Sequence, residues 1–220
     1  MKFEHTEVFN FEGALRGMRN PLESWEKSCS GYRNDLAGKQ VYWISEPDIN
    51  LAQRLIRGGS EHRKFLRQIM VSVDITAPLY CWKEFDTYKI GTVANSTSTM
   101  HKIMSKPFTL EMFEIDDFNN DIEEENFQRI LDICNDYREA YLEFKDCKEE
   151  GIQFLTKTYW KALIRILPES FLQTRTITMN YEVIRNIVHQ RKGHKLSEWE
   201  SFIDWAKTLP YAEEFIFYEN

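Results

Sequence analysis

The clearest pattern in the chain is an alternation of branched apolar residues with mostly polar ones between residues 69 and 75. A period of two with β-branched side chains on one face is typical of a half-buried strand. We therefore predict a strand over 69–75. Val71 and Val73 should be buried in it, and Ser72 and Asp74 less so.

Other segments repeat their apolar residues at helical spacing. The segments predicted as helices are 47–57, 79–85, 122–147, 152–167, 181–191 and 197–206. Pro78 ends the strand and suits the first position of the helix that follows it. Gly58-Gly59 and Gly193 provide left-handed stops, and Leu167-Pro168 ends another helix.

Two helix starts carry capping signals. Asn180 stands where an N-cap is expected, directly after a Thr- and Ile-rich segment over 171–179 that reads as a second strand. Ser197 is followed three residues later by Glu200, the pattern of a capping box. We expect both side chains to bind backbone N–H groups.

Strands mixed with longer helices, without strict alternation, indicate an α+β fold. We expect a mixed or antiparallel sheet flanked by long helices. No repeat or Gly/Ser/Pro-rich linker divides the chain, so we predict one domain over 1–220. The segment 111–125 holds eight carboxylates and no Lys or Arg, and we interpret it as an acidic surface segment.

The composition narrows the class of protein. Of 220 residues, 42% are hydrophobic and 14% aromatic, which argues against a disordered or fibrous chain. No apolar run is long enough for a membrane span, and the first residues lack the apolar stretch of a signal peptide. The four cysteines form no CxxC pair and no zinc spacing, so we expect a cytoplasmic protein with unpaired thiols.

The net charge of −7 argues against a surface that coats a nucleic acid polymer. It leaves room for a local cationic pocket that holds one nucleotide. The five histidines are scattered, so no metal site is predicted. Gly58-Gly59-Ser60 could hold a phosphate, but the helix before it needs a stop, and that interpretation is favoured.

Two groups of polar residues remain as candidates for a binding or catalytic site. The stretch 86–101 is rich in hydroxyl groups that could bind a phosphate, and an ordinary turn-rich loop explains it as well. Later in the chain, Arg165 is followed by Asn180, Asn186 and Arg191. Asn180 and Arg191 are eleven residues apart, which brings them near one helix face. An N-cap and a C-terminal arginine that favours the helix dipole are the structural alternative.

These sets, in this order, resemble the flavin-dependent thymidylate synthases, the thymidylate synthase complementing family. The likeness covers roughly 51–206. It rests on a helix that ends in Gly, a strand that ends in Ala77-Pro78, and the polar loop that follows. Further along it rests on Arg165 before Leu167-Pro168, Asn180 opening a helix, Arg191, and Glu198-Trp199-Glu200.

The family's Arg-His-Arg signature is replaced here. Counted from Ala77-Pro78 without gaps, the signature and the Ser, Glu and Ser after it fall on Thr87-Tyr88-Lys89, Thr92, Asn95 and Thr97. The Gln before the signature falls on Glu84. A shift of one residue instead aligns Asn95 with the family Asn and Ser98 with its Ser, and both registers are open. Neither keeps the arginines, and a later family Gln is Glu198.

The resemblance implies an FAD-dependent methylation of dUMP to dTMP, or a closely related pyrimidine nucleotide modification. Methylenetetrahydrofolate would supply the carbon and NADPH would reduce the flavin. The family's sites lie between subunits of a homotetramer. The cationic residues hold phosphates and polarise the uracil, and the flavin carries the redox chemistry.

The resemblance also implies roles for single residues. Arg191 is the expected catalytic residue, in contact with the uracil. The residues implied for dUMP are Glu84, Asn95, Ser96, Thr97, Ser98, Arg165 and Arg191, with the three consecutive hydroxyls around the phosphate. Those implied for FAD are Tyr88, Lys89, Asn180 and Asn186.

Three hypotheses follow for function. The first is the enzyme, and the second is a catalytically degenerate homologue that binds a nucleotide or flavin in a regulatory role. The third is an unrelated α+β interaction protein, and only the acidic segment 111–125 supports it. For the first two, we expect Arg165, Arg191 and Lys89 to converge with the loop 95–98.

Overall fold

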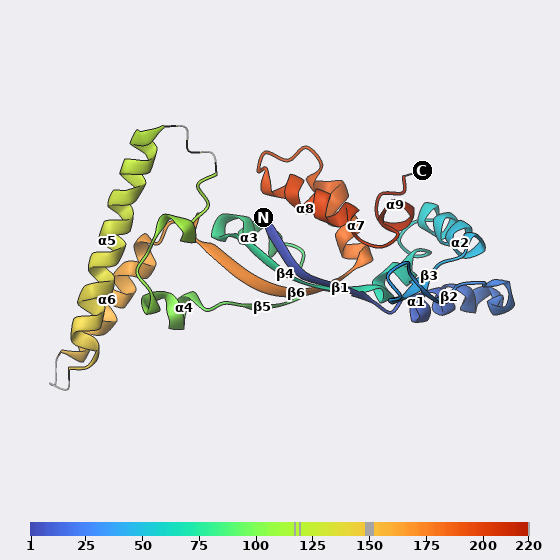
Figure 1. The fold of residues 1–220 in the computed structure, drawn as a ribbon, viewed down its shortest axis with the longest axis horizontal. Coiled ribbons are helices and arrows are strands. Elements are labelled where there is room, and N and C mark those ends of the chain that lie inside the picture. The colour runs from blue at the N-terminus through green and yellow to red at the C-terminus, as the bar shows by residue number, and fades with distance from the viewer. Residues whose placement is uncertain (117, 119, 148–151, 220) are drawn as a thin grey trace. The chain divides into compact units, whose positions relative to one another are not determined.

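The computed structural model describes residues 1–116, 118, 120–147 and 152–219 (Figure 1). The helices are α1 (Phe11–Arg19), α2 (Glu46–Arg57), α3 (Leu79–Phe85), α4 (Thr99–Lys102), α5 (Asp121–Lys145), α6 (Gln153–Ile166), α7 (Tyr181–Arg191), α8 (Glu198–Lys207) and α9 (Ala212–Phe215). The strands are β1 (Lys2–Phe9), β2 (Gly31–Asn34), β3 (Gln40–Trp43), β4 (Met70–Pro78), β5 (Val93–Ser96) and β6 (Leu172–Asn180). Short 3₁₀ turns cover Asn20–Leu22, Trp25–Lys27, Lys64–Gln68, Ile103–Ser105 and Leu110–Met112.

Four of these strands form one sheet in the order β1-β4-β6-β5. Its central pair, β4 and β6, is antiparallel. The N–H of Leu79 donates to the carbonyl of Phe171, and the N–H of Tyr181 donates to the carbonyl of Ile69. Residue numbers therefore rise along one strand as they fall along the other. β2 and β3 form a separate antiparallel pair with Tyr32 opposite Tyr42.

The predicted strand around residue 71 is confirmed as β4. Val71, Val73 and Ile75 are buried, and Ser72 and Asp74 are half-buried, in the alternation that the sequence indicates. Pro78 ends β4 and α3 covers 79–85, both as predicted, but Pro78 is not the first residue of the helix. Proline has no N–H to donate, and a strand end tolerates that loss as well as a helix start does.

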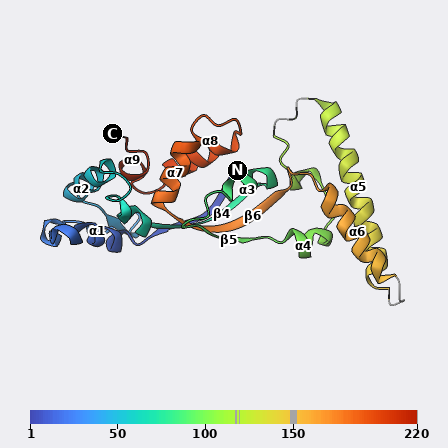
Figure 2. The ribbon, with the colours of Figure 1, turned by 180° about the vertical axis from the view of Figure 1, so that it is seen from behind.

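The chain divides into two compact units. The first comprises Met1–Ile75, Asp86–Asn95 and Arg175–Asn220, and the second comprises Thr76–Phe85 and Ser96–Thr174. The divisions fall inside β4, β5 and β6 and directly after α3. Figure 2 shows these elements from behind. One domain over 1–220 stays a prediction.

The first unit has an aromatic core under its C-terminal helices. Trp199 and Phe202 of α8 pack edge to face with ring centroids 5.9 Å apart, and Phe202 continues to Trp205 at 5.2 Å. Tyr181, at the start of α7, is fully buried and packs on Phe11 of α1. Burial raises the pKa of the Tyr181 phenol, so it stays neutral and donates to the carbonyl of Pro210.

A buried ion pair joins α1 to α2 in the same unit. Nε of Arg19 lies 2.6 Å from Oδ1 of Asp48, and both side chains are almost fully buried. The hydroxyls of Ser28, Ser30 and Ser45 donate to Oδ2 of Asp48. Burial alone would raise the pKa of Asp48, but the hydrogen bonds from these serines and Arg19 outweigh it and lower the pKa.

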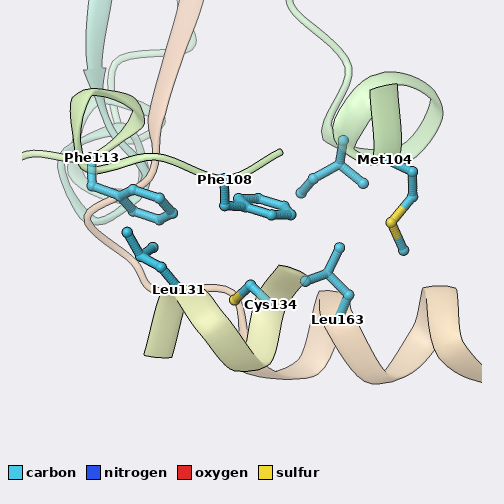
Figure 3. Close-up of a cluster of buried hydrophobic side chains, with 7 residues drawn as sticks. Met104, Phe108, Phe113, Leu131, Cys134 and Leu163 are labelled. Carbon is cyan, nitrogen blue, oxygen red and sulfur yellow. The ribbon is translucent and has the colours of Figure 1, made fainter. Parts of the chain in front are cut away.

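The second unit is built around the antiparallel hairpin of α5 and α6 (Figure 1). Its core is a hydrophobic cluster between these helices and the segment before them (Figure 3). The buried members are Ile103, Met104, Phe108, Phe113, Leu131, Cys134 and Leu163. Burial raises the pKa of the Cys134 thiol to about 11, so this cysteine is a protonated core residue.

Both helices of the hairpin confirm the predicted segments, and each carries an exposed isoleucine. Ile130 and Ile166 each keep 38% of their surface exposed. The acids of segment 111–125 gather partly in the first turn of α5, where Asn120 caps the helix and negative charge suits the dipole. Asp117 of that segment lies outside the described residues.

One capping prediction is confirmed and one is wrong. Asn180 caps α7, with Oδ1 accepting the N–H of Val183 at 3.0 Å. Ser197 precedes α8 in a helical conformation, and its hydroxyl caps no N–H group in the described part of the chain. The capping box fails because an N-cap side chain needs an extended backbone to reach the N–H groups that follow.

The buried face of β4 gives the first testable prediction. Val73→Asp would place an unpaired carboxylate where Val73 keeps 1% of its surface exposed. We expect a loss of several kcal/mol in the free energy of unfolding, measured by chemical denaturation. Ser72→Asp, on the opposite face of the strand, should cost far less. Equal losses in the two variants would contradict the burial assigned to this strand.

The buried ion pair gives the second prediction. Asp48→Asn leaves Arg19 buried without its counter-charge and should cost about 3–5 kcal/mol. Because folding lowers the pKa of Asp48, its contribution is complete above the unfolded pKa of about 3.9 and is lost as the pH falls through the folded pKa. The unfolding free energy of the variant should therefore fall less steeply than that of the wild type below about pH 4.

The control for this prediction is Asp204→Asn, which removes an exposed carboxylate on α8. It should leave both the stability and the acid slope near those of the wild type. An Asp48→Asn variant with the wild-type acid slope would contradict the assigned role of Asp48.

Candidate functional site

The structure distributes the predicted site residues over both units. Tyr88, Lys89, Asn95, Asn180, Asn186 and Arg191 belong to the first unit. Glu84, Ser96, Thr97, Ser98 and Arg165 belong to the second. The expected convergence of Arg165, Arg191 and Lys89 with the loop 95–98 involves both units and stays a prediction.

Arg191 is the most closely held of these residues. It is the last residue of α7, and its Nε–H donates to the hydroxyl of Tyr88 at 2.9 Å. The same hydroxyl donates to Oε1 of Gln190 at 3.1 Å. Tyr88 therefore fixes the end of α7 to the loop that follows α3.

Aromatic rings complete the surroundings of the Arg191 guanidinium. Its central carbon lies 4.5 Å from the ring centre of Trp199 and 5.4 Å from that of Tyr88, within range of cation–π attraction. Nη1 lies 3.1 Å from Nε2 of His194, whose Nδ1 accepts the N–H of Leu196. We call Tyr88, Gln190, Arg191, His194 and Trp199 the Arg191 cluster. It presents a permanently charged, planar group beside a tryptophan, which suits an anionic or planar aromatic ligand.

The loop before β5 lies close to the cap of α7. Gly91 has a φ of +77°, and a Cβ placed on it would come within 2.9 Å of Nδ2 of Asn180. Asn180 is 7% exposed, and its Oδ1 is already used in the cap. The Thr92 hydroxyl beside Gly91 is buried and has no hydrogen-bond partner among the described residues. A buried hydroxyl without a hydrogen-bond partner costs free energy of folding unless another group forms a hydrogen bond with it.

A pocket of about 140 Å³ lies entirely within the second unit. Two of the predicted nucleotide residues, Thr97 and Ser98, line it. Its other polar lining residues are Thr99, Lys102, Ser105 and Lys106. The apolar lining is Ile103, Met112, Phe171 and Leu172. Two cations beside several hydroxyls form the kind of surface that binds a small anion.

Hydrogen bonds hold the hydroxyl-rich side of this pocket in place. Nε2 of Gln173 donates to the carbonyl of Thr97 at 2.9 Å, and the indole N–H of Trp160 donates to the carbonyl of Met100 at 3.1 Å. The N–H of Thr97 donates to the carbonyl of Thr174. The loop is therefore tied to β6 on one side and to α6 on the other.

The remaining predicted residues lie at exposed or half-buried positions. Arg165 is exposed on the last turn of α6 and does not belong to the described lining of the pocket. Lys89, Asn95 and Ser96 are exposed, and Asn186 is half-buried on α7. Glu84 is half-buried on α3.

The structure adds residues that the sequence analysis did not select. Lys102, Ser105 and Lys106 join Ser98 in the pocket, and His194 joins Arg191. The spacing of Lys102 and Lys106, directly after a run of Ser and Thr, could have indicated the first group. The segment 86–101 contains β5 and most of α4, so it is only in part the turn-rich loop that was the alternative interpretation.

Other kinds of site receive no support from the described residues. No three His, Cys, Asp or Glu side chains in that part of the chain gather as ligands for a metal ion. None of its helices is both long enough and apolar enough to span a membrane. No disulfide joins the four cysteines in the described part of the chain, and Cys81 and Cys134 are buried.

The sequence matches no protein-family profile and no curated protein. The fold has clear relatives among solved structures. The flavin-dependent thymidylate synthase ThyX of Helicobacter pylori, complexed with FAD and dUMP, superposes with a TM-score of 0.66 at 14% identity. That match covers 99% of this chain and 98% of the other. A second structure of ThyX from Helicobacter pylori with FAD and dUMP gives a TM-score of 0.65 at 14% identity, covering 99% and 97%.

The chain has the ThyX fold. The predicted α+β class with an antiparallel sheet and helices is thereby confirmed, as is the resemblance in structure. The likeness extends over nearly the whole chain, so it includes both units and the N-terminal segment for which the sequence made no prediction. At 14% identity, the likeness establishes the fold alone, and any chemistry has to be inferred from the residues of this chain.

Proposed function

We propose that this protein binds FAD and dUMP and methylates dUMP to dTMP in the cytoplasm, with methylenetetrahydrofolate and NADPH as co-substrates. The observation that carries the proposal is the nearly full-length likeness to a thymidylate synthase that holds FAD and dUMP. An unrelated interaction protein is disfavoured by the same likeness. Three acids of segment 111–125, Asp121, Glu123 and Glu124, lie in the first turn of α5, where negative charge favours the helix dipole.

Arg191 is the proposed catalytic residue. Its guanidinium keeps its charge at any physiological pH and can polarise a uracil carbonyl or pair with a phosphate. The Arg191 cluster orients it through Tyr88 and Trp199 before any ligand arrives. An arginine that is already oriented loses less side-chain entropy on binding.

The proposed nucleotide residues are Glu84, Asn95, Ser96, Thr97, Ser98, Arg165 and Arg191. The hydroxyls of Thr97 and Ser98 support this assignment best, because both line the pocket with two lysines. Lysine carries the charge of the family arginines without their bidentate geometry. We therefore expect dUMP to bind through point charges and hydroxyls at its phosphate.

The proposed flavin residues are Tyr88, Lys89, Asn180 and Asn186, and their fit to FAD is uneven. Lys89 is exposed and Asn186 is half-buried, so both can reach a ligand. Asn180 fits poorly, because it is buried under Gly91 and caps α7. FAD, when bound, would supply the redox chemistry of the reaction, and these residues would orient it.

A second candidate function is a catalytically degenerate homologue that binds the nucleotide or flavin in a regulatory role. The observation that favours it is Thr87-Tyr88-Lys89 in place of the family's Arg-His-Arg. The Tyr88 hydroxyl is engaged with both Gln190 and Arg191, so this position serves the protein's own structure.

One experiment separates these functions. Purified protein is saturated with FAD, and flavin binding is followed by absorbance and dUMP binding by titration calorimetry. NADPH and methylenetetrahydrofolate are then added, and dTMP is measured by chromatography. Formation of dTMP supports the enzyme, and binding without dTMP supports the regulatory homologue. Failure of the folded protein to bind either ligand would overturn both.

Arg191 gives a prediction for the binding step. Arg191→Ala should weaken dUMP binding by about 1.5–3 kcal/mol, the range for a hydrogen bond to a charged group. Arg191→Lys should recover only part of this, because lysine lacks the planar fork. Tyr88→Phe is the matched control: it keeps the charge and the ring and removes only the hydroxyl that orients Arg191. Its dUMP affinity should fall between those of the wild type and Arg191→Ala.

We also propose a homotetramer, since the family completes its sites between subunits. Light scattering at micromolar concentration should then give about four times the chain mass of 26.3 kDa. A monomer that binds both FAD and dUMP would contradict the proposed sharing of sites between subunits.

A further inference from the structure

The pocket of the second unit contains two lysines that are not among the proposed nucleotide residues. Lys102 and Lys106 both line it, and neither forms an ion pair with any described residue. The protein as a whole carries a net charge of −7. Two cations without counter-charges on one small concave surface are therefore a local exception, and such a surface attracts anions.

Hydrogen-bond donors accompany the two cations. The hydroxyls of Thr97 and Thr99 have no hydrogen-bond partner in the described part of the chain. Ser98 accepts the N–H of His101 at 3.0 Å and keeps its own proton available to donate. Ser105 differs, because its proton is already donated to the carbonyl of Lys102 at 2.6 Å. The lining thus offers three hydroxyl donors and two ammonium groups to one ligand group.

The size of the pocket limits what that group can be. Its volume of about 140 Å³ is well above the roughly 10–15 Å³ that one water molecule needs. Pockets that enclose a whole drug-sized ligand are larger, about 300–1,000 Å³. A tetrahedral phosphate group has five heavy atoms and matches the available space, and the rest of a nucleotide would extend beyond it.

We infer that Lys102 and Lys106, with the hydroxyls of Thr97, Ser98 and Thr99, bind the phosphate of the nucleotide substrate. This inference rests on the proposed function and adds to it the residues that replace the missing arginine charge. A phosphate monoester carries nearly two negative charges at pH 7, and two lysines neutralise it. The apolar wall of Phe171 and Leu172 lowers the local polarity and strengthens this attraction.

The test compares ligands with and without the phosphate. The FAD-loaded protein is titrated with dUMP, with deoxyuridine and with inorganic phosphate at low ionic strength. The variants are Lys102→Gln, Lys106→Gln and the double variant. Lys161→Gln is the matched control, because it removes the same charge from an exposed position on α6 outside the described lining of the pocket.

We expect each single variant to weaken dUMP binding about tenfold and the double variant to weaken it further. Deoxyuridine should bind all variants as it binds the wild type, since it has no phosphate to lose. Inorganic phosphate should compete with dUMP in the wild type and much less in the double variant. Lys102→Arg should restore most of the dUMP affinity, and added salt should reduce the differences.

The outcomes separate this inference from the proposed function. If the wild type binds dUMP and the double variant binds it equally well, the phosphate lies elsewhere and the inference is overturned while the proposed function stands. A loss of deoxyuridine binding equal to the loss of dUMP binding also overturns it, because the lysines would then act on the fold or the base. A wild type that binds no dUMP overturns both, even if inorganic phosphate binds to the lysines.

Discussion

The antiparallel pairing of β4 with β6 is the constraint on which the rest of the structure depends. β6 begins at Leu172, which lines the pocket of the second unit together with Phe171. It ends at Asn180, which caps α7. α7 in turn ends at Arg191. A one-residue slip in this ladder would turn every β6 side chain to the opposite face and misplace both the pocket wall and the cap. The register is reinforced by Thr76 with Thr174 and by Asp74 with Thr176, whose side chains are hydrogen-bonded across the pair.

Local sequence patterns predicted the elements that depend on hydrogen bonds and apolar spacing among residues only a few positions apart. The alternation in β4 and the apolar spacing of α2, α5 and α6 gave both the type of element and most of the buried face. Asn180 was predictable because an N-cap bonds a group three residues away. Ser197 had the same local signal and failed, because the chain before α8 already turns as a helix. Nothing in the sequence around Ser197 encodes that backbone angle.

The candidate site was harder to predict, because its contacts join residues that are far apart in sequence. Tyr88 and Arg191 are separated by 103 positions, and Trp160 reaches Met100 across 60. Lys102 and Lys106 look like ordinary exposed lysines in the sequence, and only the packing of Met112 and Phe171 beside them makes a pocket. The resemblance to a family selected Thr97, Ser98 and Arg191, but it did not select Lys102 or Lys106.

The close approach of Gly91 to Asn180 ties two distant positions of the chain together. A Cβ at 91 would strike the cap amide, and the positive φ there also disfavours any other L-residue. In related chains, these two positions should therefore change as a pair. A side chain at 91 would require a shorter cap at 180, such as Ser, together with a reshaped turn. The glycine would then report on how α7 begins, and its retention in a relative would say nothing by itself about whether that relative still binds a ligand.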